Sequence, residues 1–288
     1  MIGVGTRPVY DYIVRPFVEN RGQGIFYTAK EQVDRYEQSV WPGFKEDKWI
    51  ETKEPMAVMG NLRGTDKIVY KAREHGIDYY YFDHAYMYKS IEHRRHPLFN
   101  DRYYRITKNG ESLTKLIEWD KHKDLVSRIQ KFERVQRVKV NIKTYRNKGE
   151  SILILPPTEY ICKFYNLGTE QEWLDRTIDK IKKHTKRPIV VRRKGDVEHL
   201  GTQLREAFCV VSSQTTAVID AIRHGLPSFC EDISCALPVS LTDFSKIDTP
   251  YYPTADEIQY WINSMLSAQF SETEIQIGLA KDIIDRTQ

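Results

Sequence analysis

The chain has 288 residues, of which 40% are hydrophobic and 29% charged, and its formal net charge is +4. A chain of this length can bury one large core or two modest ones, and its composition is ordinary for a soluble globular protein. No apolar run approaches the roughly 20 residues that a membrane span needs, and the first 16 residues lack the pattern of a secretory signal.

The four cysteines indicate a reducing compartment. Their positions match no zinc-ligand spacing, so we expect buried free thiols and a cytoplasmic protein. Two of them, Cys162 and Cys209, are expected inside strands; the other two are Cys230 and Cys235.

The charge is distributed unevenly along the chain. Residues 1–150 hold 29 Lys and Arg against 21 Asp and Glu, whereas residues 151–288 hold 15 against 19. The basic excess is greatest between Lys89 and Lys148, with 17 basic and 7 acidic side chains. Such a density is typical of a surface that faces an anionic partner, and the alternative is a solvated helix face.

The first half of the chain predicts a βαβ unit after a weakly patterned start. Residues 1–54 are interrupted by glycines and predict only short elements. Residues 56–60 predict a strand, residues 66–75 a helix that Gly76 ends, and residues 77–84 the next strand. A strand, a helix and a strand in this order predict a parallel sheet.

The second half continues this alternation. Residues 112–136 contain a helical pattern, and Val138, Val140 and Ile142 alternate as in a strand or a linker. Further on, we expect strands at residues 151–155, 189–191 and 208–211, and helices at residues 170–184, 197–206, 215–224, 255–266 and 272–284. The sequence therefore predicts two α/β domains with a boundary near residues 147–151.

A hydroxyl-rich turn follows one of these strands. An apolar run ends at Val211, the residues SSQTT follow at once, Gly225 and Pro227 terminate the next helix, and a further strand is expected after this stop. Such a turn offers hydroxyls and backbone N–H groups at a helix N-terminus, where ligands of α/β domains usually bind. The alternative is plain N-capping, but five such residues exceed what one cap needs. We therefore expect a phosphate or pyrophosphate to bind Ser212, Ser213, Gln214, Thr215 and Thr216.

These motifs resemble the donor-binding domain of GT-B glycosyltransferases. The resemblance lies in Arg-x-Lys-Gly at residues 192–195 and in SSQTTAVIDAIRHGLPSF at residues 212–229, and it extends to LTDFSKIDTP and LSAQFSETEIQIGLA near the C-terminus. In the first half, VMGNLRGTDKI and YYRITKNG belong to it. From about residue 55 onward, the chain is similar to capsule-type sugar transferases and to small glycosyltransferase-like proteins encoded by phages.

The resemblance implies an α/β fold of two Rossmann-like domains that face a cleft. Residues 1–148 would form a basic acceptor-binding domain, and residues 149–288 a domain that binds a nucleotide sugar, expected to be UDP-linked. The nucleotide sugar is a co-substrate, and no other cofactor is expected. A phage-encoded protein of this kind would work in the host cytoplasm.

Further residues extend the expected donor site. Arg192 and Lys194 follow a strand, and we expect them to offset the charge of the departing diphosphate, because the neighbouring strand end carries the hydroxyl-rich turn. The alternative is an ordinary surface strand end. The resemblance also implies an acidic side chain that holds the ribose, for which the chain offers Asp220, or Glu231 and Asp232.

The first domain offers candidates for the catalytic base. Asp83 and His84 end a predicted strand, and either could take a proton from an acceptor hydroxyl, Asp83 being the first choice. The alternative is a polar turn. Gly60, Asn61 and Arg63 lie in a glycine-flanked loop that could hold a phosphate, although a tight turn explains this loop nearly as well.

A basic and aromatic segment follows. Basic residues interleaved with aromatic ones suit a phosphate backbone with stacked bases, and the alternative is a tyrosine core solvated by arginines. The expected acceptor-binding residues here are Arg94, Arg95, Arg102, Tyr104 and Arg105.

The function expected first is glycosyl transfer to a hydroxymethylated pyrimidine in phage DNA, with the base flipped out of the duplex. No Asp-x-Asp occurs in the chain, which favours a metal-independent mechanism. Three alternatives stay open: a glycan or capsule glycosyltransferase, a UDP-sugar 2-epimerase, and a non-enzymatic nucleic-acid-binding protein.

Overall fold

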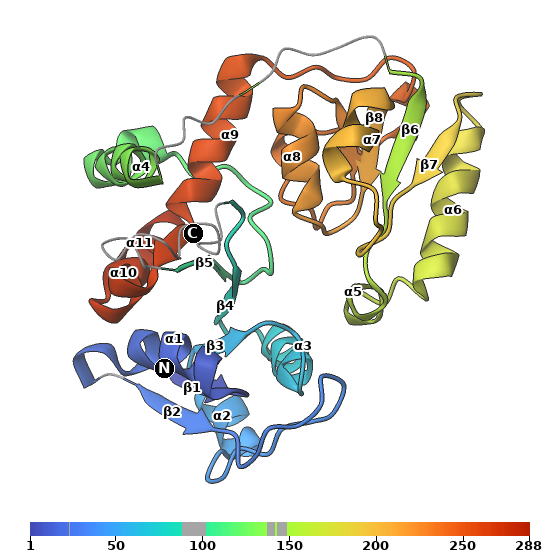
Figure 1. Ribbon diagram of the computed structural model, residues 1–288. Helices are drawn as coiled ribbons and strands as arrows, with labels where there is room; N and C mark the ends of the chain where they lie inside the picture. The colour runs from blue at the N-terminus through green and yellow to red at the C-terminus, as the bar shows by residue number, and fades with distance from the viewer. Residues whose placement is uncertain (23, 88–101, 137–141, 143–148) are drawn as a thin grey trace. The chain divides into compact units, whose positions relative to one another are not determined.

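The computed structural model describes the chain apart from residues 23, 88–101, 137–141 and 143–148, and it divides into two compact units (Figure 1). Unit 1 comprises Met1–Glu111, Asp120–His122 and Met265–Gln288, and unit 2 comprises Ser112–Trp119 and Lys123–Ser264. Each unit holds one sheet with helices, so the expected α/β class is confirmed. No helix within the described ranges is long and apolar enough to cross a membrane.

Unit 1 contains a six-stranded mixed sheet in the order β10-β5-β4-β3-β1-β2. The pairs among β1 to β4 are parallel, whereas β5 runs antiparallel to both β4 and β10. The strands are β1 (Ile2–Gly5), β2 (Ile25–Thr28), β3 (Met56–Met59), β4 (Tyr79–His84), β5 (Tyr103–Lys108) and β10 (Gln269–Ser271). The helices are α1 (Pro8–Glu19), α2 (Glu46–Thr52), α3 (Thr65–His75), α10 (Glu272–Gln276) and α11 (Leu279–Thr287).

The expected βαβ unit is confirmed as β3-α3-β4, with Gly76 as the left-handed C-cap of α3. The weakly patterned first 54 residues hold a second unit of this kind, β1-α1-β2. Glycines in β1 concealed it, because they replace the apolar side chains that mark a strand. A Cβ at Gly3 would lie 2.6 Å from Val18, so glycine lets α1 approach the sheet closely.

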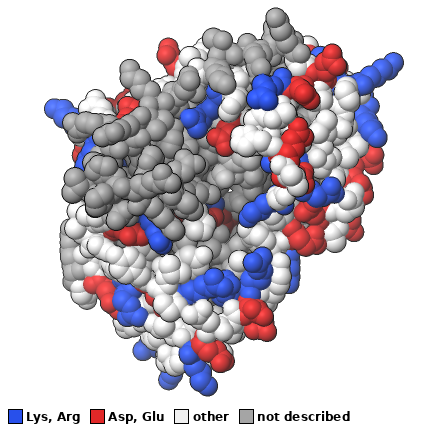
Figure 2. Space-filling view, in the orientation of Figure 1, with Lys and Arg blue, Asp and Glu red and all other residues white. Residues whose placement is uncertain are grey.

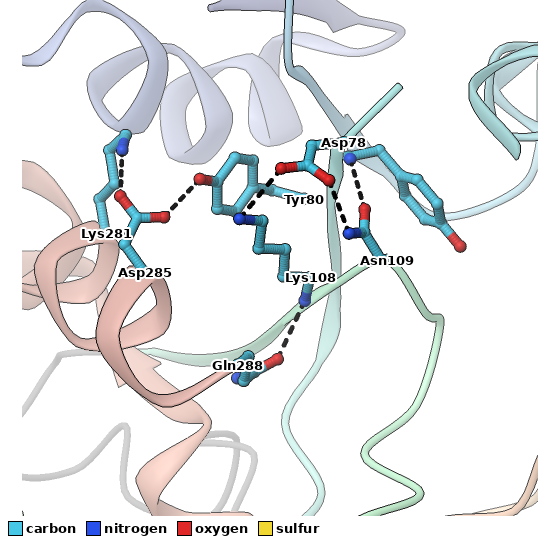
Figure 3. A network of polar contacts seen from close by, with 8 residues as sticks. Asp78, Tyr80, Lys108, Asn109, Lys281, Asp285 and Gln288 are labelled. Carbon is cyan, nitrogen blue, oxygen red and sulfur yellow. Dashed lines mark hydrogen bonds and ion pairs between the residues drawn. The ribbon is translucent and has the colours of Figure 1, made fainter. Parts of the chain in front are cut away.

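The C-terminal segment belongs to unit 1. Strand β10 pairs with β5, with Phe270 opposite Tyr104. Helix α11 is attached to β4 and β5 by polar contacts, shown in Figure 3: the Tyr80 hydroxyl donates to Asp285, and the Lys108 backbone N–H donates to Gln288 at 2.9 Å. The division therefore differs from a single boundary between residues 148 and 149, since residues 265–288 return to the first sheet.

Unit 2 contains a four-stranded sheet in the order β7-β6-β8-β9, in which every pair is parallel. The strands are β6 (Ser151–Leu155), β7 (Ile189–Val191), β8 (Ala207–Ser212) and β9 (Ser228–Cys230). The helices are α4 (Lys123–Gln136), α5 (Glu159–Phe164), α6 (Glu170–Lys182), α7 (Leu200–Glu206), α8 (Ala217–Arg223) and α9 (Ala255–Ser267), whose last residues belong to unit 1.

Both faces of this sheet are buried, which explains the continuous apolar runs of its strands. On β6, Ile152 and Ile154 pack with Trp173 of α6, whereas Leu153 and Leu155 pack in a second cluster with Leu204 of α7.

Several expected elements differ from those observed. The helix expected over residues 272–284 is two helices separated at Gly278, whose φ is +82°. The pattern in residues 112–136 is α-helical only from Lys123, after a 3-10 turn at Trp119–Lys121. Cys162 lies in α5 rather than in a strand, although all four thiols are buried and free as expected. Val138 and Val140 lie outside the described residues.

Candidate functional site

The hydroxyl-rich turn lies at the carboxyl edge of the unit 2 sheet. Because the four strands are parallel, the residues that follow β6, β7, β8 and β9 all emerge at this edge. The turn follows β8, the central strand between β6 and β9. The expected donor residues Ser212 to Thr216 therefore occupy the position where ligands of parallel α/β sheets usually bind.

The first two hydroxyls of the turn are buried. The Ser213 hydroxyl donates to Glu231, which follows β9, and the indole N–H of Trp173 donates to the other Glu231 oxygen at 2.9 Å. Ser212 is 1% exposed, and its Oγ has no hydrogen-bond partner. A buried hydroxyl without a partner is unusual in a folded protein.

The remaining three residues of the turn are half-buried. The Gln214 amide donates to the Tyr165 hydroxyl at 3.0 Å, and Thr215 Oγ1 accepts from the Ala217 backbone N–H at 3.3 Å. Thr216 is the N-cap of α8, but its side chain makes no capping hydrogen bond. Helix capping therefore accounts for one of the five residues. Since α8 has seven residues, its dipole adds less to anion binding than a longer helix would.

The expectation that Arg192 lies at the strand end beside the turn is wrong. Strand β6 lies between β7 and β8, so Arg192 and Lys194 follow a strand that does not neighbour β8. The Arg192 guanidinium instead donates to the Glu198 carbonyl at 2.5 Å and to Gln203 at 2.9 Å. Asp220 is exposed on α8 and pairs with Arg223 at 3.5 Å.

In unit 1, Asp83 and His84 end β4 as expected, but Asp83 is engaged by other groups. One of its oxygens pairs with Arg105 of β5 at 2.5 Å, and the other accepts the His84 backbone N–H at 2.6 Å. The His84 side chain is exposed, and its ring lies between Tyr104, stacked at 6.4 Å, and Tyr10, edge-on at 6.5 Å. Asp83 is therefore half-buried and hydrogen-bonded at the strand end, and the His84 side chain is the more exposed of the two.

The glycine-flanked loop after β3 is tightly structured. Gly60 and Gly64 have φ of +67° and +89°, and the Thr65 hydroxyl lies within hydrogen-bond distance of the Gly60 carbonyl, at 2.9 Å. Asn61 and Arg63 are both buried, and Arg63 Nε donates to the Val33 carbonyl at 3.0 Å.

The arginines expected to contact an acceptor do not share one environment. Arg63 and Arg105 are 7% and 6% exposed, Arg102 is exposed, and Arg94 and Arg95 lie outside the described residues. On the face drawn in Figure 2, the coloured Lys and Arg side chains are interspersed with Asp and Glu. Buried and ion-paired arginines such as Arg105 cannot contribute contacts to a nucleic-acid backbone.

Sequence reasoning missed the groups that hold the turn. Trp173 and Tyr165 precede it by about 40 residues or more and carry no motif; the apolar pattern of α6 assigns Trp173 simply to the core. Glu231, one of the residues offered for the ribose, is half-buried and accepts hydrogen bonds from Ser213 and Trp173. Within the described ranges, no three His, Cys, Asp or Glu residues gather as in a metal site.

No protein-family model and no curated protein matches the chain. The solved structures that are similar to it include two of KpsC from Thermosulfurimonas dismutans, both 11% identical. The beta Kdo 2,4 transferase has a TM-score of 0.46, with coverage of 91% of this chain and 89% of the other. The beta Kdo 2,7 transferase has a TM-score of 0.48, with coverage of 98% of both chains. At this level, the likeness carries no conclusion about activity.

Proposed function

We propose that the protein is a glycosyltransferase that moves a sugar from a nucleotide-sugar donor to a hydroxyl group of a glycan. The observation that carries this proposal is the turn after β8. Five consecutive polar residues lie at the carboxyl edge of a parallel sheet, helix capping explains one of them, and the buried Ser212 hydroxyl has no partner. Hydroxyls and backbone N–H groups at this edge suit a donor diphosphate.

Each residue near the turn has a proposed part in donor binding. Gln214, Thr215 and Thr216 hold the diphosphate, and Asp220, exposed on α8, reaches the ribose. Glu231 positions the turn, because both of its oxygens are occupied by Ser213 and Trp173. Arg192 and Lys194 lie farther from the turn, since β6 separates their strand from β8.

We propose His84 as the general base. A base needs an accessible lone pair near the hydroxyl that it deprotonates. Asp83 is half-buried and its carboxylate pairs with the buried Arg105, whereas the His84 side chain is exposed. Asp83 would then position the strand end rather than take the proton.

A glycan acceptor is favoured over DNA because Arg105 is buried and ion-paired with Asp83, which removes one of the expected contacts with a phosphate backbone. Hydroxymethylated DNA is the second candidate, because residues 89–148 carry 17 basic and 7 acidic side chains. DNA binding through such a segment would weaken steeply with salt.

The test is a transfer assay with a panel of nucleotide sugars. The acceptors are neutral and acidic oligosaccharides, DNA with hydroxymethylcytosine or hydroxymethyluracil, and unmodified DNA, with products read by mass spectrometry. We expect a sugar-sized mass gain on a glycan, and a gain on a modified base would transfer the assignment to DNA. No gain, together with no thermal protection by any nucleotide sugar, would contradict the enzyme assignment.

Variants separate the proposed roles. We expect Thr216→Ala to weaken donor binding about five- to tenfold, the value of one lost hydrogen bond, while the exposed Thr249→Ala leaves it unchanged. We expect His84→Gln to lower kcat about a hundredfold or more and to remove the acid limb of the pH profile, where activity rises with pH as a general base loses its proton. We expect Asp83→Asn to lower the melting temperature and to lower kcat by less than His84→Gln does. A large loss of kcat at an unchanged melting temperature would restore Asp83 as the base.

A further inference from the structure

Three arginines of unit 1 gather at the carboxyl ends of β1 and β3. Arg7 follows β1 as the N-cap of α1, and Arg63 follows β3. These strands are adjacent and parallel. Arg35 belongs to the same place, because its backbone carbonyl accepts from the Arg63 N–H at 3.1 Å.

The placement of Arg63 is unusual. Its φ is +61°, a conformation that costs a non-glycine residue about 1 kcal/mol. Its side chain is almost fully buried, yet only Nε has a hydrogen-bond partner, the Val33 carbonyl. The loop thus holds a guanidinium in place and leaves its terminal nitrogens without protein acceptors.

The positive charges of this cluster are compensated only in part. Burial lowers the pKa of Arg63, the charges of Arg7 and Arg35 lower it further, and Asp34 and Tyr10 act in the opposite direction. Among the described residues, no carboxylate forms an ion pair with any of the three arginines. Like charges gathered without a counterion are unfavourable unless something else neutralises them.

Two buried polar atoms in this region have no partner. Arg7 Nε and Ser39 Oγ are both buried without a hydrogen bond, and Ser39 is 2% exposed. Ser39 lies in the same loop system, since its backbone N–H donates to the Arg63 carbonyl at 3.0 Å. A serine hydroxyl and guanidinium forks are the donors that recognise a carboxylate or a phosphate.

We propose that Arg7, Arg35, Arg63 and Ser39 bind one oxyanion, a carboxylate or a phosphate, carried by the glycan acceptor. Assigning this group to the acceptor rests on the proposed function. Tyr10 lies between the cluster and the proposed base: its charge acts on Arg63, and its ring lies edge-on to His84 at 6.5 Å. Three arginines around one place suit a single oxyanion, whereas a DNA backbone would need charges spread along a surface.

The experiment measures anion binding without any donor. Inorganic phosphate, glucuronate and neutral glucose are titrated by calorimetry at constant ionic strength. The proteins are the full chain, Arg7→Gln, Arg35→Gln and, as the matched control, Lys48→Gln, an exposed lysine of α2. We expect one of the two anions to bind, each arginine variant to weaken it about five- to tenfold, and the control and glucose to show no effect. The tighter anion assigns the group as phosphate or carboxylate.

Three outcomes would overturn this site. They are no binding of either anion, equal binding by all variants, or an equal loss of affinity in Lys48→Gln, which would show that the anion responds only to the overall charge of the protein.

Thermal unfolding without ligand tests whether the cluster is merely structural. Removing the exposed Arg35 relieves its repulsion with the other arginines, so the melting temperature of Arg35→Gln should equal or exceed that of the wild type. If the cluster had a structural role, the substitution would lower the melting temperature. Anion binding with no glycosyl transfer would contradict the proposed function alone, and equal transfer to acidic and neutral glycans would contradict the acceptor assignment.

Discussion

Asp11 is a buried carboxyl group with one oxygen that lacks a hydrogen-bond partner. It lies in the first turn of α1, is 6% exposed, and its Oδ1 has no hydrogen-bond partner. Burial raises the pKa of this carboxyl, against the smaller opposing effects of the Arg7 backbone N–H, the Arg15 charge and Thr28. The folded chain therefore holds the proton more tightly than the unfolded chain, and the ionised form is unfavourable in the fold.

We expect Asp11→Asn to raise the melting temperature at pH 7. A raised carboxyl pKa means that wild-type stability falls as pH rises from the unfolded value, about 3.9, through the folded one. The amide escapes this loss, so its advantage should shrink as pH falls toward 4. Thermal unfolding of both proteins between pH 4 and 8 measures this, with the exposed Asp47→Asn as control. A pH-independent shift would contradict the assignment.

At the scale of elements, one glycine divides the last helical segment. The pattern of residues 272–284 is continuous, but Gly278 adopts φ +82° and becomes the N-cap of α11. A Cβ at this position would lie 1.7 Å from Nδ2 of Asn20, the C-cap of α1. The break therefore lets α10 and α11 approach the end of α1.

Gly278→Ala and Gly76→Ala separate backbone strain from this close approach. Both positions have positive φ, so each substitution should cost about 1 kcal/mol. A Cβ at Gly76 would meet nothing within 4 Å, whereas one at Gly278 would meet the side chain of Asn20, so only Gly278→Ala should lose a further amount of about 0.5–1.5 kcal/mol, the cost of pushing that side chain off its rotamer. Urea denaturation measures both, and equal losses would show that Asn20 moves aside freely.

At the scale of the whole molecule, the first unit is built from both ends of the chain. Residues 265–288 supply β10, which pairs with β5, and α11, which Asp285 joins to Tyr80. Without them β5 becomes an open edge, and strand edges without a partner are exposed to local opening and aggregation.

We expect a chain truncated after Ser264 to lose protection in unit 1 while unit 2 retains its own. Hydrogen exchange should speed up in β4 and β5 and stay slow in β6 and β8, whose parallel pairing does not involve the removed residues. Deletion of Gln288 alone is the control, because it keeps β10 and removes the hydrogen bond to Lys108. A uniform loss of protection in both sheets would contradict two separate units.

The sequence by itself determined the local features. Alternating apolar runs and glycine stops gave β3-α3-β4, the strands of unit 2 and four buried thiols, because these patterns reflect the period and burial of each segment. The hydroxyl-rich turn was visible for the same reason, since one contiguous segment carries it.

Only the tertiary structure decided which segments are neighbours. It put β6 between β7 and β8, joined Asp83 to Arg105, returned residues 265–288 to the first sheet and brought Arg7, Arg35 and Arg63 together. Strand order and the pairing of distant side chains depend on packing between segments far apart in the chain, for which periodicity and propensity carry no signal.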